Sequence, residues 1–551
     1  MASRAPVRFP GSGGPGVNKH LSPRSARSDS MGERRRVSAW SEDGGARAGG
    51  DPGGGGGRLV PLLRGIFHVE KTSCDVSLTS SRLLWSPIRP DTPGSSKVQA
   101  QPQEASIELK DIFSVKLKRR RLAGQEKGGT LLGLTIFVCI RKGHKLKEKA
   151  IDFHNLSEDF CDIWHRQLKE ILNGFPNRPK CLKVIINPHS HKGEAPNVYY
   201  RHVAPLFKLA DIQAHVTETN YKGHALTLLK ECELQEYDGI VCVGGDGTVS
   251  EVVHGLLLRA QMDAGKTVNG NLSPVRAPLP LGIIPSGTTD VLAYSLHGIK
   301  HPVTAALHII MGNIQPVDAC TFSTEDKLLR FGFSSMFGFG GRSLALAEKH
   351  RWMPSSQRRD FAVIKTLASL KPDNCELSFL PISSQQLPFH HKRKHEDSLP
   401  EDKDEWKHIG GELLNVSIMA IPCLCSMAPG GLAPNTRLND GTMELIIVRN
   451  TSRPEFVKHL KRYATQKNQF DFPFVETHLV KEVKLCPQNT QNGNGFYEHT
   501  ELSEDLHPWN IDGDLLEASS EVHVRLHPEL INLYGSNIEE LDEAKATCNC
   551  L

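Results

Sequence analysis

The chain has 551 residues, and its 66 Lys and Arg against 62 Asp and Glu give a formal net charge of +4. This length exceeds one ordinary hydrophobic core and predicts about three folding units with some disorder. Because the charge is nearly balanced, a protein that binds polyanions over its whole surface is a poor expectation. The sequence contains no apolar run of about 18 residues and no signal-peptide pattern, so we expect a soluble or peripherally attached protein.

The 13 cysteines are mostly scattered singly and form no paired C-x-x-C motifs. This spacing is typical neither of a secreted disulfide scaffold nor of zinc knuckles, and it predicts reduced thiols in the cytosol or nucleus. The segment around Cys548 loosely resembles a prenylation box, but Asn549 is not aliphatic, so lipidation is not expected.

The first 58 residues are rich in Gly, Ser and Arg and poor in large apolar residues, which predicts a disordered arm over 1–58. From residue 59 to 175 the texture changes to short apolar or alternating runs separated by turn-like stretches, which predict antiparallel strands. These runs are 65–69, 82–85, 106–109, 112–115 and 134–138.

A helix is predicted after these strands, because Ser157 is a suitable N-cap and Gly174 a suitable end. Its expected buried stripe consists of Phe160, Ile163, Trp164, Leu168 and Ile171. Several strands closed by one amphipathic helix resemble a pleckstrin-homology domain, which implies contact with a lipid or membrane surface. The alternative is a small structural barrel without a ligand.

From residue 178 to 318 the pattern alternates between strands and helices, which predicts a parallel α/β sheet with ligand loops at the carboxyl ends of its strands. The expected strands are 182–186, 215–219, 239–243 and 281–284, and the expected helices are 199–209, 224–232 and 249–258.

Strand-like segments dominate from residue 319 to 535, among them 413–420, 443–448 and 521–526, and predict a β-rich lobe. Two polar stretches, near 383–409 and 487–508, are expected to be exposed insertions, and 536–551 to be a flexible tail. The predicted fold class is therefore α/β plus β: a pleckstrin-homology-like domain followed by an α/β lobe and a β-rich lobe.

One glycine-rich turn carries the clearest chemistry. The buried strand 239–243 runs into Gly244-Gly245-Asp246-Gly247-Thr248, and the next helix is expected to start near Val249. Glycines permit positive φ and close backbone approach to an anion, and a helix N-terminus favours phosphate. A carboxylate there can hold a magnesium ion or take a proton from an attacking hydroxyl. Taken alone, the motif could equally be an ordinary turn.

Three further motifs accompany this turn in chain order: Asn187-Pro188 before it, and Gly287-Thr288-Thr289-Asp290 and Asp512-Gly513-Asp514 after it. Over about 180 to 530 this series resembles the diacylglycerol kinase catalytic domain family, which includes sphingosine and ceramide kinases and is related in fold to NAD kinases. A preceding pleckstrin-homology-like domain is similar to the arrangement in ceramide kinases. The runs 108–120, 337–342 and 419–425 are similar to the ceramide kinase-like branch of that family.

The resemblance implies a two-lobed lipid kinase fold in which ATP with Mg²⁺ phosphorylates a lipid hydroxyl and Asp246 accepts the proton. It implies lipid contacts at Gly244, Gly245, Asp246, Gly247 and Arg342. It implies nucleotide contacts at Asn187, Pro188, His189, Thr219, Asn220, Tyr221, Lys222, Gly223, Glu251, Arg351, Arg358, Asp512, Gly513 and Asp514. Arg351 and Arg358 have an alternative interpretation as solvated charges. Which side chains would hold the metal is left open.

Three departures from the family pattern argue against ceramide kinase activity. Ser190-His191 stands where the family usually has glycines, which predicts weaker ATP binding. Arg342 replaces a carboxylate expected at the lipid head and cannot accept a hydrogen bond. Asp514 is one methylene shorter than the usual Glu. The alternative function is therefore a catalytically silent protein that binds lipid or nucleotide in a regulatory, signalling or scaffolding role.

A basic cluster, defined here as Lys116, Lys118, Arg119, Arg120 and Arg121, lies at the end of a predicted strand. Such a cluster can bind anionic lipid headgroups at about 1 kcal/mol per charge or act as a nuclear import signal, the alternative being a solvated loop. Aromatic residues do not interleave with it, so nucleic acid is not an expected partner. We expect the protein in cytoplasm, nucleus and nucleolus, and peripherally on Golgi and endoplasmic reticulum membranes.

Overall fold

The computed structural model describes residues 61–88, 104–125, 128–270, 272–382, 405–465, 468–488, 507–536 and 538. The predicted arm over 1–58, almost all of the two predicted insertions, the tail from 537 on apart from residue 538, and Cys548 lie outside these residues. Among the described helices, none combines the length and the apolar character needed to traverse a bilayer.

The first described domain is a seven-stranded antiparallel sheet in the order β4-β3-β2-β1-β7-β6-β5. Its strands are β1 (Leu63–Val69), β2 (Thr72–Leu78), β3 (Arg82–Pro87), β4 (Ala105–Glu108), β5 (Ile112–Arg120), β6 (Thr130–Lys142) and β7 (Lys145–His154). All five predicted strands are present. β2 and β7 were not predicted, because both carry many polar residues on their exposed faces.

Helix α1 (Glu158–Asn173) packs on this sheet and begins as predicted, with the Ser157 hydroxyl accepting the Phe160 N–H. Its fully buried residues are Cys161, Trp164, Leu168 and Leu172. The predicted stripe is wrong at Ile163, whose side chain is 46% exposed. Cys161 is buried instead, because residues 161, 164, 168 and 172 share one face at the i, i+3, i+4 spacing of an α-helix.

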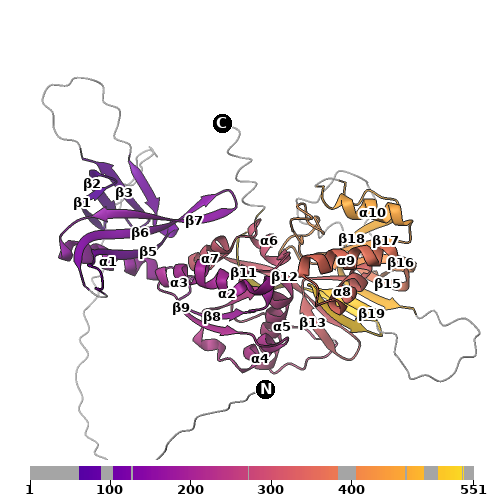
Figure 1. Cartoon of the computed structure of the whole chain (residues 1–551). Coiled ribbons are helices and arrows are strands. Elements are labelled where there is room, and N and C mark those ends of the chain that lie inside the picture. The colour runs from indigo at the N-terminus through magenta and orange to yellow at the C-terminus, as the bar shows by residue number, and fades with distance from the viewer. Residues whose placement is uncertain are drawn as a thin grey trace, which may run out of the picture. The chain divides into compact units, whose positions relative to one another are not determined.

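The α/β lobe is built on four parallel strands in the spatial order β11-β10-β8-β9, in agreement with the predicted sheet (Figure 1). The strands are β8 (Cys181–Ile186), β9 (Gln213–Glu218), β10 (Gly239–Gly244) and β11 (Leu281–Pro285). The helices are α2 (Ala195–Val198), α3 (Ala204–Leu209), α4 (His224–Glu231), α5 (Asp246–Asp263), α6 (Val291–His297) and α7 (Pro302–Met311), with a π-helical turn at Tyr199–Val203. Every residue of β10 is buried, so the glycine turn leaves the centre of the sheet.

In its described residues the β-rich lobe consists of antiparallel strands of 5 to 13 residues with three helices. The strands are β12 (Ile314–Ser323), β13 (Leu328–Gly332), β14 (Ser334–Gly338), β15 (Asp373–Pro381), β16 (Lys407–Met419), β17 (Met443–Arg449), β18 (Val475–Pro487), β19 (His507–Ile511), β20 (Asp514–Ala518) and β21 (Val522–Tyr534). The helices are α8 (Phe339–Lys349), α9 (Ser355–Ala368) and α10 (Arg453–Arg462). The predicted insertion bounds are too wide, since β16 begins at Lys407 and β19 at His507.

Strand β21 joins the two lobes. It pairs in parallel with β11 through Leu281 and Leu533, and antiparallel with β12 and β18. Within the described ranges one 14-stranded sheet therefore runs through both predicted lobes. Strands β10 and β21 are in close contact at this junction. A Cβ on Gly239 of β10 would lie 2.8 Å from the hydroxyl oxygen of Tyr534 in β21.

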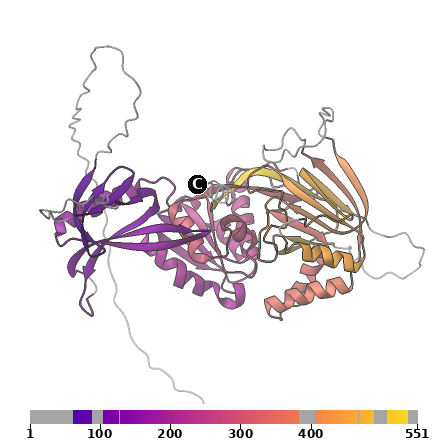
Figure 2. The same cartoon turned by 90° about the horizontal axis from the view of Figure 1, so that it is seen from above.

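Helices α8 and α9 lie beside each other next to the strands of the β-rich lobe (Figures 1 and 2). Helix α9 turns Ala362 and Thr366 inward, where both are buried, whereas Ile364 is 67% exposed. This inner face of α9 forms one wall of the cavity described below.

Candidate functional site

The glycines of the glycine turn are required by close packing and not by unusual backbone angles. Gly245 is the N-cap of α5 with φ of −99°, and among the motif glycines none has a positive φ. A Cβ on Gly245 would lie 2.9 Å from the Gly287 Cα, and one on Gly244 would lie 2.7 Å from the Thr248 Cβ. The prediction of positive φ is therefore wrong here. Glycine is needed because two loops pack backbone against backbone.

Asp246 stands at the start of α5 and reaches across to the loop that contains Gly287 and Asp290, called the second loop below. Its two carboxylate oxygens accept the backbone N–H groups of Asp290 at 2.9 Å and of Val291 at 2.6 Å. Burial, with a smaller contribution from the charge of Asp290, raises the pKa of Asp246 to about 7. Near neutral pH this carboxyl is therefore divided between its acid and base forms, which suits proton transfer.

The second loop is held rigidly by Asp290, which adopts a left-handed conformation with φ of 56°. Its carboxylate accepts the Gly287 N–H at 2.9 Å and pairs with the Lys300 ammonium at 2.8 Å. This arrangement orients the first N–H groups of α6 toward Asp246, so Asp290 positions the candidate base.

Asp512 is a further carboxylate beside the same site. Its oxygens accept the N–H groups of Phe333 and Ser334, each at 2.8 Å, and the Ser334 hydroxyl at 2.9 Å. Burial raises the pKa of Asp512. The Gly513 N–H donates to the Asn510 side chain at 2.9 Å, which fixes the turn between β19 and β20.

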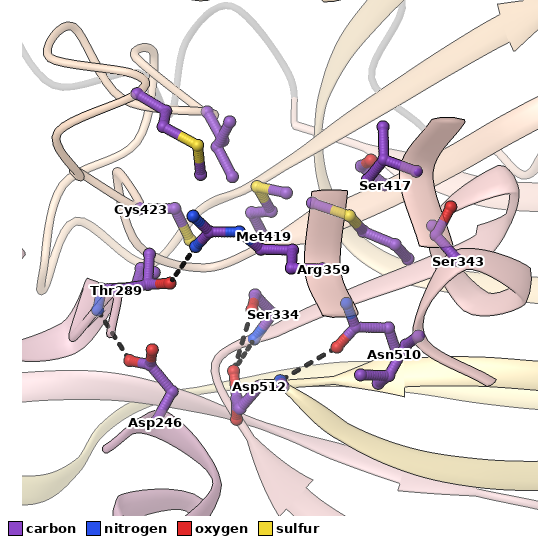
Figure 3. Close-up of a pocket in the computed structure, with 18 of the residues that line it drawn as sticks. Asp246, Thr289, Ser334, Ser343, Arg359, Ser417, Met419, Cys423, Asn510 and Asp512 are labelled. Atoms are coloured by element: carbon purple, nitrogen blue, oxygen red, sulfur yellow. Dashed lines mark hydrogen bonds between the residues drawn. The ribbon is translucent and has the colours of Figure 1, made fainter. Parts of the chain in front are cut away.

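A cavity of about 580 Å³ opens from these carboxylates into the β-rich lobe (Figure 3). Asp246, Asp512, Asn510, Thr289 and Arg359 line its polar end, and Arg359 donates to the Thr289 hydroxyl at 3.2 Å. The remaining walls are mostly apolar and include Val249, Leu292, Phe333, Met336, Phe339, Leu344, Ala362, Val363, Met419, Ile421, Leu432, Val448, Phe456 and Leu460. An apolar chamber with acids at one end fits a molecule with a long tail and a polar head.

The predicted lipid-contact residues do not all reach this cavity. Asp246 and Gly247 line it, whereas Gly244 and Gly245 of the same turn are outside the lining. Arg342 is also outside: its guanidinium pairs with Asp373 and donates to the Lys371 carbonyl at 2.6 Å. Arg342 does not face this cavity, because α8 turns position 342 away from the wall that carries Gly340 and Ser343, and its contact with a lipid head stays a prediction.

Several predicted nucleotide-contact residues surround the glycine turn. The Asn187 amide donates to the Thr248 hydroxyl at 2.8 Å and accepts the His189 N–H at 3.0 Å, with Pro188 between them. Ser190 begins a 3₁₀ turn (Ser190–Gly193), and its hydroxyl donates to the Ser286 carbonyl at 3.2 Å. Hydrogen bonds from the side chains of Asn187 and Ser190 therefore hold this loop against its neighbours.

The loop 219–223 follows β9, beyond the loop that follows β8, and the side chain of Glu251 supports it. The Glu251 carboxylate accepts the Ala225 N–H at 2.8 Å, so it caps α4 rather than projecting freely. Within the loop Thr219 is buried, Tyr221 stacks on His224 with ring centroids 4.8 Å apart, and Gly223 has φ of 92°. Asn220 donates its N–H to the His224 ring at 3.0 Å.

The last predicted motif divides between two places. Asp512 and Gly513 line the cavity, whereas the Asp514 carboxylate turns toward Lys222 at 2.7 Å and Arg330 at 2.6 Å. Arg358 lines the cavity, but Arg351 pairs with Glu348 and is outside the lining. The interpretation of Arg351 as a surface charge therefore fits the structure better than a site role.

Sequence reasoning missed Arg359, Asn510 and Arg330. A signal existed for Arg359, because positions 359, 362, 363 and 366 follow the i, i+3, i+4, i+7 spacing of one helix face. Asn510 and Arg330 gave no such signal, since their roles depend on strand pairings between distant segments.

The basic cluster is partly structural. Lys116 pairs with Asp211 at 2.5 Å, Lys118 with Asp152 at 2.5 Å and Arg119 with Glu158 at 2.6 Å. All three belong to β5, so the alternative of a solvated loop is wrong for them. Arg120 ends β5 and Arg121 follows it, and both are exposed.

Three family matches cover most of the chain: the ceramide kinase PH domain over residues 63–168, the diacylglycerol kinase catalytic domain over 181–322 and the ceramide kinase C-terminal domain over 333–551. A putative diacylglycerol kinase of known structure from Bacillus anthracis str. Sterne is 18% identical, with a TM-score of 0.44 over 65% of this chain and 98% of its own.

Several curated relatives are more similar to this chain in sequence. The ceramide kinase-like protein of Homo sapiens is 58% identical over 510 residues, covering 87% of this chain and 91% of its own length. The ceramide kinase of Homo sapiens is 32% identical over 530 residues, covering 87% and 97%. Ceramide kinase 1 of Caenorhabditis elegans is 28% identical, covering 71% and 72%. Together with the geometry above, these matches show that the chain belongs to the ceramide kinase family of lipid-kinase-like proteins.

Proposed function

We propose that the chain transfers the γ-phosphoryl group of ATP to a hydroxyl of an amphiphilic lipid whose tail fills the apolar cavity. The observation that carries this proposal is the position of Asp246. Its carboxyl lies at the polar end of the cavity and has a pKa of about 7. A general base is most effective when its pKa lies near the working pH.

The start of α5 supports nucleotide binding at this place. A helix of 18 residues directs the positive end of its dipole and its first N–H groups toward the loop, where they favour a phosphate. Gly223 offers open backbone on the neighbouring loop, because a Cβ there would meet no atom within 4 Å.

In the proposed reaction a residue of the chain carries the proton. The lipid hydroxyl gives its proton to Asp246 while its oxygen bonds to the γ-phosphorus. The bond between that phosphorus and the oxygen bridging to the β-phosphate breaks, and ADP leaves with the electron pair. The cationic Arg359, at the polar end of the cavity, lies where it can attract the phosphoryl oxygens.

Magnesium, which family membership implies, has no all-protein site among the described carboxylates, and in nucleotide sites it is usually held by one or two carboxylates together with substrate phosphates. Among the described residues no group of three or more His, Cys, Asp or Glu could hold a metal ion. Both oxygens of Asp514 contact cationic side chains, and both oxygens of Asp246 accept N–H groups. We therefore assign no step to a metal.

The pleckstrin-homology domain is the natural membrane-binding part, and anionic headgroups fit the exposed Arg120 and Arg121. Peripheral attachment to Golgi and endoplasmic reticulum membranes would bring the cavity to its lipid. The same two charges could serve nuclear import, so distribution between cytoplasm, nucleus and nucleolus belongs to this proposal.

A second function, lipid or nucleotide binding without transfer, is favoured by one observation. Each oxygen of Asp246 and of Asp512 already accepts a hydrogen bond from the protein, so these carboxylates also serve as structural caps. A silent regulatory or scaffolding protein would need no more than that.

The deciding experiment incubates purified full-length protein with labelled ATP and a panel of sphingoid bases, ceramides and diacylglycerols, beside Asp246→Asn. Label on a lipid that disappears in the variant supports transfer. Nucleotide binding with no labelled lipid in either protein would contradict catalysis and leave the silent function. Asp263→Asn, which removes a carboxylate at the other end of α5, is the matched control.

A further inference from the structure

Three charged side chains from separate segments meet beside the glycine turn. The Asp514 carboxylate at the start of β20 accepts the Lys222 ammonium at 2.7 Å on one oxygen and the Arg330 guanidinium at 2.6 Å on the other. Lys222 belongs to the loop between β9 and α4, and Arg330 to β13. The bridge therefore ties the loop 219–223 of the α/β lobe to two strands of the β-rich lobe.

The two arms of the bridge differ in exposure. The side chains of Arg330 and Asp514 are only 13% and 16% exposed, whereas that of Lys222 is 59% exposed. Breaking the inner arm would leave a shielded charge unpaired, which is costly. The outer arm faces water and can open easily.

Arg330 is not fully satisfied in this arrangement. Its buried Nε has no hydrogen-bond partner in the described part of the chain. A guanidinium has five N–H donors in a planar fork that matches phosphate as well as carboxylate. An incoming phosphate could therefore give this side chain more than Asp514 alone gives it.

The bridge lies next to the place where a phosphate is expected. A Cβ on Gly513, one residue before Asp514, would lie 3.5 Å from the Asp246 Cβ, and one on Gly247 would lie 4.0 Å from the Gly513 carbonyl. Lys222 is at the same time part of the candidate nucleotide loop. Asp514 and its two cations are therefore close neighbours of the start of α5.

We propose that Lys222, Asp514 and Arg330 form a latch beside the candidate nucleotide loop 219–223, in which Asp514 occupies two cations that a polyphosphate would otherwise bind. Latch closure and polyphosphate binding then exclude each other, and Lys222 and Arg330 are polyphosphate ligands once Asp514 is displaced. The inference rests on the proposed nucleotide function and adds its control by the chain's own carboxylate.

The latch predicts that the change Asp514→Asn shifts nucleotide affinity in the direction opposite to that expected if Asp514 were a ligand. If Asp514 were itself a ligand of nucleotide or metal, Asp514→Asn would weaken binding. If Asp514 competes for the cations, the same change strengthens binding by about tenfold, the size of one charge-assisted hydrogen bond. Arg330→Met should weaken binding by a similar factor, because the variant loses a phosphate ligand.

The experiment titrates full-length wild type, Asp514→Asn, Arg330→Met and the control Asp263→Asn with a fluorescent N-methylanthraniloyl ATP, with magnesium and with EDTA. Tighter binding only in Asp514→Asn supports the latch, also where wild type binds too weakly to measure. Equal or weaker binding in Asp514→Asn overturns the latch while the nucleotide function stands. Absence of binding in every protein overturns both.

A second measurement does not depend on nucleotide and covers a variant that folds poorly. Amide hydrogen exchange in the loop 219–223 should be several-fold faster in Lys222→Met than in wild type, because the exposed arm alone anchors the loop to Asp514. Exchange at the wild-type rate would show that the bridge does not restrain the loop, and would overturn the latch.

Discussion

The Asp246 carboxylate accepts the Val291 N–H at 2.6 Å, so the candidate base is also the cap of α6. A catalytic carboxyl usually keeps a free edge toward its substrate. Here one side chain connects the first turn of α5 to the first turn of α6. The proposed activity and the local stability therefore depend on the same two oxygens.

Asp246→Asn should reduce both quantities. An amide offers one oxygen and one NH₂ group where two N–H donors converge, so one donor loses its acceptor, at a cost of about 1 to 3 kcal/mol of unfolding free energy. Lipid phosphorylation, if present, should fall at least about a hundredfold. Denaturant titration and a labelled-ATP assay measure the two effects. A variant as stable as wild type would contradict the capping role.

Glu444 provides a pH test away from the cavity lining. Burial raises its pKa to about 7, although its carboxylate accepts two hydrogen bonds from Asn435. A raised carboxyl pKa means that the folded state holds a proton that the unfolded state releases, so stability is lost as pH rises from about 4.5 to 7.

In Glu444→Gln this loss should be absent. Between about pH 4.5 and 7 the unfolding free energy of the variant should therefore rise relative to that of wild type by on the order of 3 kcal/mol. Urea unfolding at pH 4.5, 6 and 7.5 checks this difference. A constant difference between the two proteins would show that Glu444 titrates normally.

Arg342 and Asp373 offer a double-mutant cycle. Because Arg342 pairs with Asp373 outside the cavity, Arg342→Asp should place two carboxylates together and destabilise the protein by about 3 kcal/mol. It should not open the site to sphingoid lipids. The swapped pair Arg342→Asp with Asp373→Arg should recover much of the stability. Thermal unfolding and lipid-panel assays measure both, and a gain of sphingoid phosphorylation would restore Arg342 to the site.

The apolar cavity can be filled from α9. Ala362 is buried on its inner wall, so Ala362→Phe should fill part of the chamber and reduce lipid capture more than about tenfold. Ile364→Phe, on the exposed face of the same helix, adds similar bulk toward solvent and is the control. Photo-crosslinking with a lipid diazirine compares the two. Equal capture by both variants would move the lipid elsewhere.

The basic cluster should separate into two groups. Arg120→Ala with Arg121→Ala should weaken binding to anionic vesicles by about 1 kcal/mol per charge without changing stability. Lys118→Ala should instead lower stability, because Asp152 loses its partner. Vesicle sedimentation, thermal unfolding and imaging of a fluorescent fusion distinguish the groups. Unchanged nuclear and membrane distribution in the double variant would reject the cluster as a targeting signal.

Local patterns were enough to predict the parallel strands, the glycine turn and the Ser157 cap. Each of these depends on residues within a few positions of one another. The direction of Arg342, the pairing of Asp514 with Arg330, and the exposure of Ile163 were not predictable in the same way. They depend on contacts between segments that only the folded chain brings together, and a helical stripe fixes its orientation only to within about one residue.

Strand β21 has a consequence for synthesis of the protein. The parallel sheet of the α/β lobe keeps the edge of β11 unpaired until residues 522–534 have left the ribosome. An unpaired hydrophobic edge is open to wrong partners. A frameshift or premature stop shortly before Val522 should therefore leave the α/β lobe translated but with the edge of β11 unpaired. Such a product should depend on chaperones and be degraded quickly, although every motif of the candidate site is already present.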